Sequence, residues 1–326
     1  MGLLVNGKWQ DKWYDTKNSK GSFERQESRF RHQISDAQDA LYQPEAGRYH
    51  LYVSLACPWA HRTLIFRELK GLQDIISVSV VEAEMLENGW EFGEQGSKTA
   101  DPLHGFDYLY QVYLKAAPDY EGRVTVPVLW DKKTQTIVNN ESSEIIRIFN
   151  TAFNSLTGNQ NNYYPDTLQS RIDEINDEIY DAINNGVYRA GFATTQAAYE
   201  EAFFQLFEKL DWLEEHLANN RYLVGERLTE ADWRLFTTLI RFDAVYHGHF
   251  KCNRNKVSEF HHISNYVREL YQVANVASTV DFDHIKVHYY ASHRTINPTL
   301  VVPVGPVLDF DAPHDRAQLN AQSSSE

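Results

Sequence analysis

The sequence predicts an α/β domain followed by an all-α helical-bundle domain. Between Arg48 and about residue 153, runs rich in β-branched and aromatic residues alternate with amphipathic helical segments. From Leu168 onward, helical periodicity dominates and strand-like runs nearly vanish. The 326 residues are enough for two ordinary domains, and a hydrophobic content of 42% supports packed cores.

Residues 1–47 are polar and aromatic without clear periodicity, so we expect an N-terminal extension. The α/β domain is expected over residues 48–153, with an insertion at 82–122 that is too long and too rich in Gly and Pro for a simple connection. Three further segments should follow: a polar linker (154–166), the helical domain (167–293) and a C-terminal arm (294–326). The arm holds four prolines and a Ser-rich tail, so it should be extended and fray at its end.

The order of elements in the first domain is that of a thioredoxin-like fold. Residues 49–54 and 75–81 are typical of strands, and a helix begins between them at Pro58, which gives a βαβ unit. Residues 126–131 and 136–139 predict two more strands joined by a short turn, and another helix opens at Glu141. In the second domain, the spacing of Ile172, Ile175, Ile179 and Ile183 is typical of a helix with one buried face.

A lone thiol, Cys57, stands where the first strand gives way to the first helix. Free N–H groups and the positive end of the helix dipole favour a thiolate there, and Pro58 suits the first helical turn. Thiols in such positions can have a pKa lowered from about 8.5 to about 3.5–7.5, so we expect a nucleophile. The alternative is a buried, inert cysteine of the core.

Ala60 occupies the position of the second cysteine in a C-x-x-C redox motif. A dithiol oxidoreductase releases its mixed disulfide by attack from that second sulfur, so this chain needs a resolving thiol from elsewhere. A small external thiol is the natural supplier.

Charge and cysteine content limit the partners. The net charge of −14 opposes nonspecific binding to nucleic acid or anionic membranes, and no apolar run is long enough to span a bilayer. Two cysteines cannot staple a secreted scaffold, so we expect a cytoplasmic protein. The stretch from His247 to Cys252 offers nitrogen and sulfur ligands, but it lacks a fourth ligand and paired cysteines, so we expect no metal site.

Three separated stretches, 54–62, 187–193 and 284–293, resemble the xi class of the glutathione transferase superfamily, the glutathionyl-hydroquinone reductases, and are closest to its enterobacterial members. The resemblance runs along nearly the whole chain. It implies the glutathione transferase fold, a homodimer, and glutathione as co-substrate with no permanently bound cofactor. It also implies an enzyme that reduces glutathionyl-hydroquinones to hydroquinones through a Cys57–glutathione mixed disulfide.

The peptide part of glutathione has a predicted seat around Val126. A thioredoxin-like fold places a cis peptide before a proline such as Pro127, which would turn the Val126 N–H and C=O toward an extended peptide. Glu141 and Ser142 offer a carboxylate and a hydroxyl at a helix start for the γ-glutamyl group. Each feature has a structural alternative: a proline that starts an edge strand, and plain helix capping. The expected glutathione-binding residues are Trp90, Arg123, Val124, Thr125, Val126, Pro127, Glu141 and Ser142.

Four residues take their significance from the resemblance alone. Trp90 matches the family's glutathione-contacting tryptophan, and Tyr188 matches its proton donor and acceptor. Tyr246 and Tyr289 match residues that hydrogen-bond the catalytic sulfur. Without the resemblance, each would be presumed to have a packing role.

Two other classes of function stay open from the sequence. A glutaredoxin-like thiol transferase or dehydroascorbate reductase would use the same Cys57 chemistry. A non-catalytic binding protein of transferase fold would need no nucleophile, and Cys57 argues against it. Conjugation of glutathione to electrophiles is disfavoured, because a cysteine occupies the place of the activating hydroxyl and would form a mixed disulfide.

Overall fold

The computed structural model describes residues 2–14 and 19–319. The predicted fraying of the Ser-rich tail falls on residues 320–326, which lie outside the described residues. The chain divides into two compact units, each built from three segments. The first unit comprises Met1–Trp13, Arg25–Asn161 and Asp281–Ser292, and the second comprises Tyr14–Glu24, Asn162–Val280 and His293–Glu326.

A four-stranded mixed sheet forms the centre of the first unit. Its strands, in spatial order, are β4 (Ser77–Val80), β3 (Tyr49–Val53), β8 (Val128–Asp131) and β9 (Thr136–Asn139). β3 is parallel to β4 and antiparallel to β8, which in turn is antiparallel to β9. Every residue of β3 is buried, as expected of a central strand that is covered on both faces. This order of strands confirms the predicted thioredoxin-like topology.

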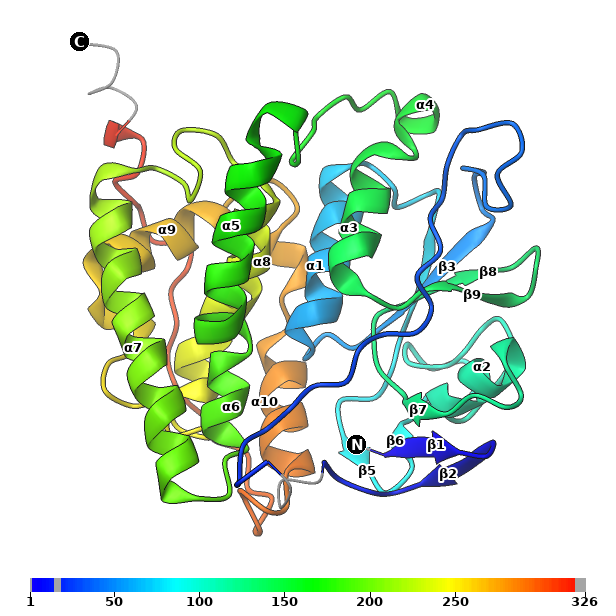
Figure 1. Cartoon of the computed structure of the whole chain (residues 1–326), viewed down its shortest axis with the longest axis horizontal. Helices are drawn as coiled ribbons and strands as arrows, with labels where there is room; N and C mark the ends of the chain where they lie inside the picture. Colours follow the sequence, from blue (N-terminus) through cyan, green and yellow to red (C-terminus); the bar gives the residue numbers. More distant parts are fainter. Residues whose placement is uncertain (1, 15–18, 320–326) are drawn as a thin grey trace. The chain divides into compact units, whose positions relative to one another are not determined.

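Three helices accompany the sheet. α1 (Pro58–Leu69) packs against α3 (Ser142–Thr151), and the two stand side by side in Figure 1. α2 (Leu109–Ala116) lies in the predicted insertion and contacts β9. Beyond α3, the chain forms the single turn α4 (Asn154–Thr157).

Two small sheets in the first unit were not foreseen from the sequence. β1 (Leu3–Val5) pairs with β2 (Lys8–Gln10) and with β7 (Gly122–Arg123). The insertion contributes the hairpin of β5 (Met85–Leu86) and β6 (Gly89–Trp90).

Trp9 on β2 packs against the β5–β6 hairpin. Its indole N–H donates to the carbonyl oxygen of Glu87 over 2.8 Å. Gly89 has φ +75°, and a Cβ there would come within 2.6 Å of the Trp9 ring. Glycine is therefore required at this position both by the backbone conformation and by the close approach of the ring.

The second unit is helical. Its longer helices are α5 (Gln169–Ile179), α6 (Gly186–Gly191), α7 (Gln196–Asn219), α8 (Glu230–Arg241) and α9 (His261–Tyr271). Short helical turns are η1 (Asp166–Leu168), η2 (Tyr180–Asn184), η3 (Phe242–Tyr246), η4 (Val257–Glu259) and η5 (Ala277–Thr279). η2 and η3 are π-helical turns that directly follow α5 and α8. The bundle confirms the predicted all-α part of the chain.

Two segments are grouped apart from their sequence neighbours. Helix α10 (Phe282–Ser292) follows the bundle in sequence but belongs to the first unit, where it contacts β5. Residues Tyr14–Glu24 precede the sheet but belong to the second unit. Within the described ranges, no helix combines the length and the apolar character that a membrane span requires.

Candidate functional site

Cys57 stands at the N-terminal end of α1, as the sequence predicted. It is the N-cap residue, with φ −76° and ψ 119°, and Pro58 follows it in the first turn. The Cys57 N–H donates to the carbonyl oxygen of Ser54 over 3.2 Å, which fixes the turn that leads from β3 into α1. The Cys57 sulfur is not part of a disulfide, and the residue is half-buried. A cysteine at this position lies at the positive end of the helix dipole, which favours a thiolate.

The Cys57 thiol lies against the predicted peptide seat. Its Sγ donates a hydrogen bond to the carbonyl oxygen of Val126, with a sulfur–oxygen distance of 3.7 Å. The Val126–Pro127 peptide bond is cis, as the sequence analysis expected. Strand β8 begins only at Val128, so Val126 and Pro127 precede the sheet.

A buried tyrosine supports the residue before this seat. The Tyr113 hydroxyl donates to the carbonyl oxygen of Thr125 over 2.8 Å, and it accepts from the Thr125 N–H over 3.3 Å and from the Asn140 amide over 3.1 Å. Burial raises the pKa of Tyr113, so this hydroxyl keeps its proton. No local signal in the sequence connects Tyr113 or Asn140 with the run around Val126.

The rest of the predicted glutathione-binding run precedes Thr125. Arg123 ends β7, and its guanidinium donates to the backbone carbonyl oxygen of Lys12. Val124 is buried. The run from Arg123 to Pro127 is therefore anchored at one end by β1 and at the other by the Cys57 contact.

Glu141 is the N-cap residue of α3. Its carboxylate accepts from the Ser143 N–H over 3.1 Å and from the Ser143 hydroxyl over 2.9 Å. The Ser28 hydroxyl donates to its other oxygen over 3.2 Å. Ser142 is the first helical residue and is buried. Capping, the structural alternative for Glu141, is thus observed, and a ligand role at the same helix start stays a prediction.

Trp90 lies on β6 and is buried. Its ring stacks on that of His288, with centroids 4.9 Å apart and planes inclined by 15°. Its indole N–H is buried and meets no hydrogen-bond acceptor in the described part of the chain. A buried donor of this kind costs free energy until an acceptor reaches it.

Two arginines stack on Trp59 in the first turn of α1. The guanidinium carbons of Arg25 and Arg62 lie 4.8 Å and 4.5 Å from the ring centroid of Trp59. Both are cation–π contacts, and they bring positive charge close to the helix end that carries Cys57. Arg62 is the last residue of the stretch 54–62 that carries the family resemblance, but no local signal in the sequence points to Arg25.

The three predicted tyrosines are divided between the units. Tyr289 lies on α10 of the first unit, is buried, and meets the ring of His288 edge-on. Tyr188 on α6 and Tyr246 on η3 belong to the second unit, where their ring centroids are 6.0 Å apart. The structure thus brings Tyr188 and Tyr246 together, and it groups Tyr289 with the unit that carries Cys57.

The second cysteine has the properties of a core residue. Cys252 is fully buried, and burial strongly raises the pKa of its thiol. The described residues include no group of three or more His, Cys, Asp or Glu side chains able to hold a metal ion.

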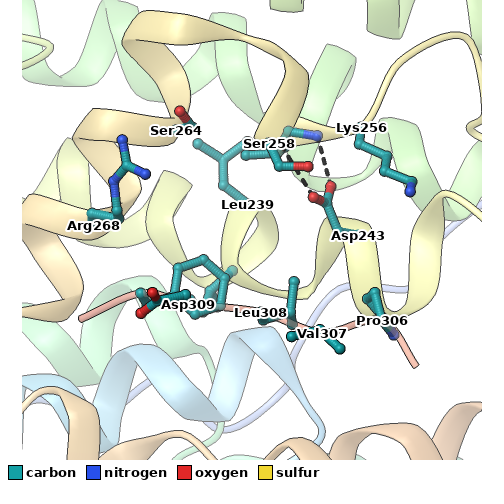
Figure 2. Close-up of a pocket in the computed structure, with 13 residues that line it drawn as sticks. Leu239, Asp243, Lys256, Ser258, Ser264, Arg268, Pro306, Val307, Leu308 and Asp309 are labelled. Carbon is teal, nitrogen blue, oxygen red and sulfur yellow. Dashed lines mark hydrogen bonds between the residues drawn. The ribbon is translucent and has the colours of Figure 1, made fainter. Parts of the chain in front are cut away.

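The second unit also has a pocket that contains none of the predicted site residues. Figure 2 shows it between the C-terminal arm, at Pro306–Phe310, and the helical residues above. Asp243 lies at its edge and caps η4, accepting from the N–H groups of Val257 and Ser258 over 2.6 Å and 3.1 Å. Lys256 and Arg268 stand on opposite sides of the pocket.

Two family models match the chain. Residues 56–152 match the N-terminal domain of glutathione S-transferases, and residues 196–269 match the C-terminal domain of the same family. The matched regions contain Cys57 and the predicted peptide seat in the first case and Tyr246 in the second.

Characterised relatives extend the similarity over nearly the full length. The glutathionyl-hydroquinone reductase YqjG of Escherichia coli is 55% identical over 325 residues, covering 97% of this chain and 98% of its own. The glutathionyl-hydroquinone reductase PcpF of Sphingobium chlorophenolicum is 56% identical, covering 94% of this chain and 96% of its own.

Solved structures agree with these relatives. The glutathione-bound structure of Escherichia coli YqjG superposes with a TM-score of 0.88 at 51% identity, covering 97% of this chain and 99% of its own. The xi-class glutathione transferase of Natrialba magadii gives a TM-score of 0.92 at 53% identity, covering 98% of both chains.

Proposed function

We propose, since this chain belongs to the xi class of the glutathione S-transferase family, that it is a glutathionyl-hydroquinone reductase which uses Cys57 as its nucleophile. The observation that carries the proposal is the place of the Cys57 thiol. Cys57 is half-buried at the start of α1, and its thiol contacts the Val126 carbonyl oxygen. Ala60 occupies the position at which a resolving cysteine would stand. The substrate pair is a glutathionyl-hydroquinone and free glutathione, with no permanently bound cofactor.

The first step transfers the glutathionyl group to the enzyme. The Cys57 thiolate attacks the glutathione sulfur, forming an S–S bond as the bond between that sulfur and the aromatic carbon breaks. The electron pair of the broken bond stays with the carbon, which takes up a proton and leaves as part of the hydroquinone. By resemblance, Tyr188 assists this proton transfer, and Tyr246 and Tyr289 hydrogen-bond the sulfur of Cys57.

The second step regenerates the enzyme. The thiolate of a second glutathione attacks the mixed disulfide, giving oxidised glutathione and the Cys57 thiolate. In sum, one glutathionyl-hydroquinone and one glutathione give one hydroquinone and one disulfide. Because Ala60 supplies no sulfur, the enzyme depends on this external thiol.

Glutathione has a seat in the first unit. Its cysteinyl part pairs with the backbone of Val126, in the manner of a short added strand. Its γ-glutamyl group is held at the start of α3 by Glu141 and Ser142. Arg123, Val124, Thr125 and Pro127 shape the run that presents Val126, and the unpartnered indole N–H of Trp90 offers a donor to an oxygen of the tripeptide.

A substrate panel tests this function against its rivals. The purified protein is assayed with glutathione and one of three substrates: a glutathionyl-hydroquinone, β-hydroxyethyl disulfide, or an electrophilic aryl chloride. The proposal predicts that hydroquinone release is favoured in kcat/KM over disulfide reduction and that no aryl conjugate forms. Preferred turnover of the disulfide would instead assign a glutaredoxin-like thiol transferase, and no turnover in any arm would leave a binding protein.

The setting of the enzyme is part of the proposal. We propose a cytoplasmic homodimer that does not engage nucleic acid or membranes, supported by the net charge of −14 and by two cysteines that form no disulfide with each other. Val301, Val304 and Val307 on the arm are 68%, 97% and 100% exposed, and association of two chains would bury such an apolar row. Light scattering of the wild type and of Val304→Asp tests this: the wild type should be dimeric, and a monomeric wild type would contradict it.

A further inference from the structure

Helix α10 presents three polar side chains at a four-residue spacing, His284, His288 and Ser292. Residues at this spacing lie on one face of a helix, one turn above the other. Each of the three forms a hydrogen bond to a segment that lies some 200 residues earlier in the sequence and belongs to the same compact unit. The helix itself is capped by Asp281, whose carboxylate accepts from the His284 N–H over 2.8 Å.

Two of these contacts hold the hairpin that carries Trp90. The Nδ1–H of His288 donates to the carbonyl oxygen of Ala83 over 2.9 Å, which fixes the ring's orientation because a carbonyl oxygen can only accept. The Ser292 hydroxyl accepts from the N–H of Met85, the first residue of β5, also over 2.9 Å. The His288 ring meanwhile stacks on Trp90 at 4.9 Å.

The third contact reaches the turn before the nucleophile. His284 Nε2 and the Ser54 hydroxyl lie 3.4 Å apart and form a hydrogen bond. Ser54 is fully buried, and its carbonyl oxygen accepts from the Cys57 N–H. One face of α10 therefore joins the Cys57 turn to the Trp90 hairpin.

We infer that His288 is a positioning residue for glutathione binding, because it fixes the ring plane of Trp90 and anchors the strand before it. His284 holds the turn before Cys57, and Ser292 holds β5. We call these three residues of α10, His284, His288 and Ser292, the clamp. This inference rests on the proposed function, since it takes Trp90 as a glutathione contact. These contacts agree with the grouping of α10, which follows the bundle in sequence, with the unit that carries Cys57.

Three variants separate the two contacts of His288. His288→Phe keeps a ring over Trp90 and removes the donor, His288→Asn keeps a donor near Nδ1 and removes the ring, and His288→Ala removes both. The matched control is His216→Ala, because His216 also stacks on a tryptophan, Trp212, at 5.0 Å and bonds a carbonyl oxygen, that of Leu223, at 3.1 Å. His216 lies in the second unit and has no part in the clamp.

The first measurement is hydrogen exchange over residues 83–90 in the unliganded protein. His288→Ala should accelerate exchange in this segment about ten-fold, with Phe and Asn in between and His216→Ala unchanged. Should His288→Ala fail to fold, Ser292→Ala removes the acceptor of the Met85 N–H and should speed exchange in the same segment. Wild-type exchange rates in the foldable variants would overturn the clamp.

The second measurement is steady-state kinetics. His288→Ala should raise the KM for glutathione about three- to ten-fold while kcat changes less than about two-fold, and this effect should disappear in a Trp90→Phe background. If His288 only stabilised the fold, His288→Ala would lower the melting temperature without raising KM relative to kcat. An unchanged KM would overturn the positioning role. Absence of any glutathione-dependent turnover in the wild type would instead refute the proposed function, and hydrogen exchange would still decide whether the clamp exists.

Discussion

The thiol of Cys57 donates a hydrogen bond to the carbonyl oxygen of Val126, with 3.7 Å between sulfur and oxygen. The two residues are separated by 69 positions in the sequence. The contact places the nucleophile beside the backbone groups proposed to bind the cysteinyl part of glutathione. A glutathionyl sulfur bound at Val126 would therefore arrive next to the attacking thiolate, which is the arrangement that the first transfer step needs.

Replacement of the nucleophile should separate chemistry from binding. Cys57→Ser and Cys57→Ala should each lower kcat by about a thousand-fold or more, because no second sulfur at position 60 can take over. Glutathione affinity, measured by calorimetry, should change by less than about ten-fold, since the proposed peptide contacts do not involve the sulfur. Near wild-type turnover by Cys57→Ala would contradict a covalent route.

Removal of the Tyr113 hydroxyl should weaken the binding of glutathione at Val126 indirectly. Tyr113→Phe leaves the Thr125 carbonyl and the Asn140 amide without this buried partner, so the free energy of unfolding should fall by about 1–3 kcal/mol. Glutathione affinity should fall as well, because Thr125 precedes Val126. The control is Tyr49→Phe. The Tyr49 hydroxyl donates to the carbonyl oxygen of Gln43, with a distance of 2.7 Å, and neither residue belongs to the run around Val126. Equal glutathione affinities in the two variants would show that Tyr113 has only a packing role.

Gly191 should be required for the packing of Phe250 against the tyrosines of the second unit. A Cβ at Gly191 would lie 2.2 Å from the Phe250 ring, which itself packs against Tyr188 and Tyr246 with centroids 5.5 Å away in each case. Gly191→Ala should therefore displace Phe250 and destabilise the protein by about 1–3 kcal/mol.

Gly186 on the same helix provides the control for this prediction. A Cβ there meets its nearest neighbour, the Asp181 carbonyl oxygen, at 3.3 Å, so Gly186→Ala should be tolerated better. Chemical unfolding measures the stabilities, and near-ultraviolet circular dichroism reports the tyrosine surroundings. If the spectrum and stability of Gly191→Ala match those of Gly186→Ala, the proposed support of the tyrosines by Phe250 is wrong.

The free energy of unfolding should fall in acid, in part because Asp131 becomes protonated. Burial opposes its charge, but hydrogen bonds from Arg48, at 2.7 Å and 2.8 Å, and from Thr134 and the Lys133 N–H hold the pKa of Asp131 below its usual value. A lowered folded-state pKa stabilises the protein above about pH 4, the range of the unfolded chain, and this stabilisation is lost as the pH falls through the folded-state value.

The test compares unfolding free energies at about pH 5 and about pH 3. Asp131→Asn should remove part of the acid-induced loss, together with a drop in stability at the higher pH. Asp211→Asn is the control, because the pKa of Asp211 is also lowered by Arg254 but the pair is exposed and contributes less. The assignment would be contradicted if Asp211→Asn reduced the loss of unfolding free energy between the two pH values more than Asp131→Asn does.

Local patterns in the sequence were sufficient for the central elements. Strands β3, β4, β8 and β9 lie within the runs rich in β-branched and aromatic residues, although β8 begins two residues later than expected, at Val128. Helices α1 and α3 begin where Pro58 and the capping residue Glu141 predicted them. The cis peptide before Pro127 was also predicted, because the residue order around it is typical of this fold. Such features depend on neighbours in sequence, which a single chain reveals.

The small sheets and the packing of α10 could not be predicted from local sequence. β1 and β2 have three residues each, too few for a clear hydrophobic pattern, and β1 pairs with β7 more than a hundred residues away. The periodicity of α10 predicts a helix but does not indicate the partner against which it packs. Its polar residues His284, His288 and Ser292 carry a spacing that could have been noticed, yet their partners become visible only in the folded chain.

Mass spectrometry of the intact protein tests the central claim most directly. The reduced protein is mixed with one equivalent of glutathionyl-hydroquinone in the absence of free glutathione, and then quenched with acid. We predict a mass increase of one glutathionyl group located at Cys57, together with release of one equivalent of hydroquinone, and loss of both on Cys57→Ser. Release of hydroquinone without a glutathionyl adduct, or an adduct at Cys252 in place of Cys57, would contradict the account.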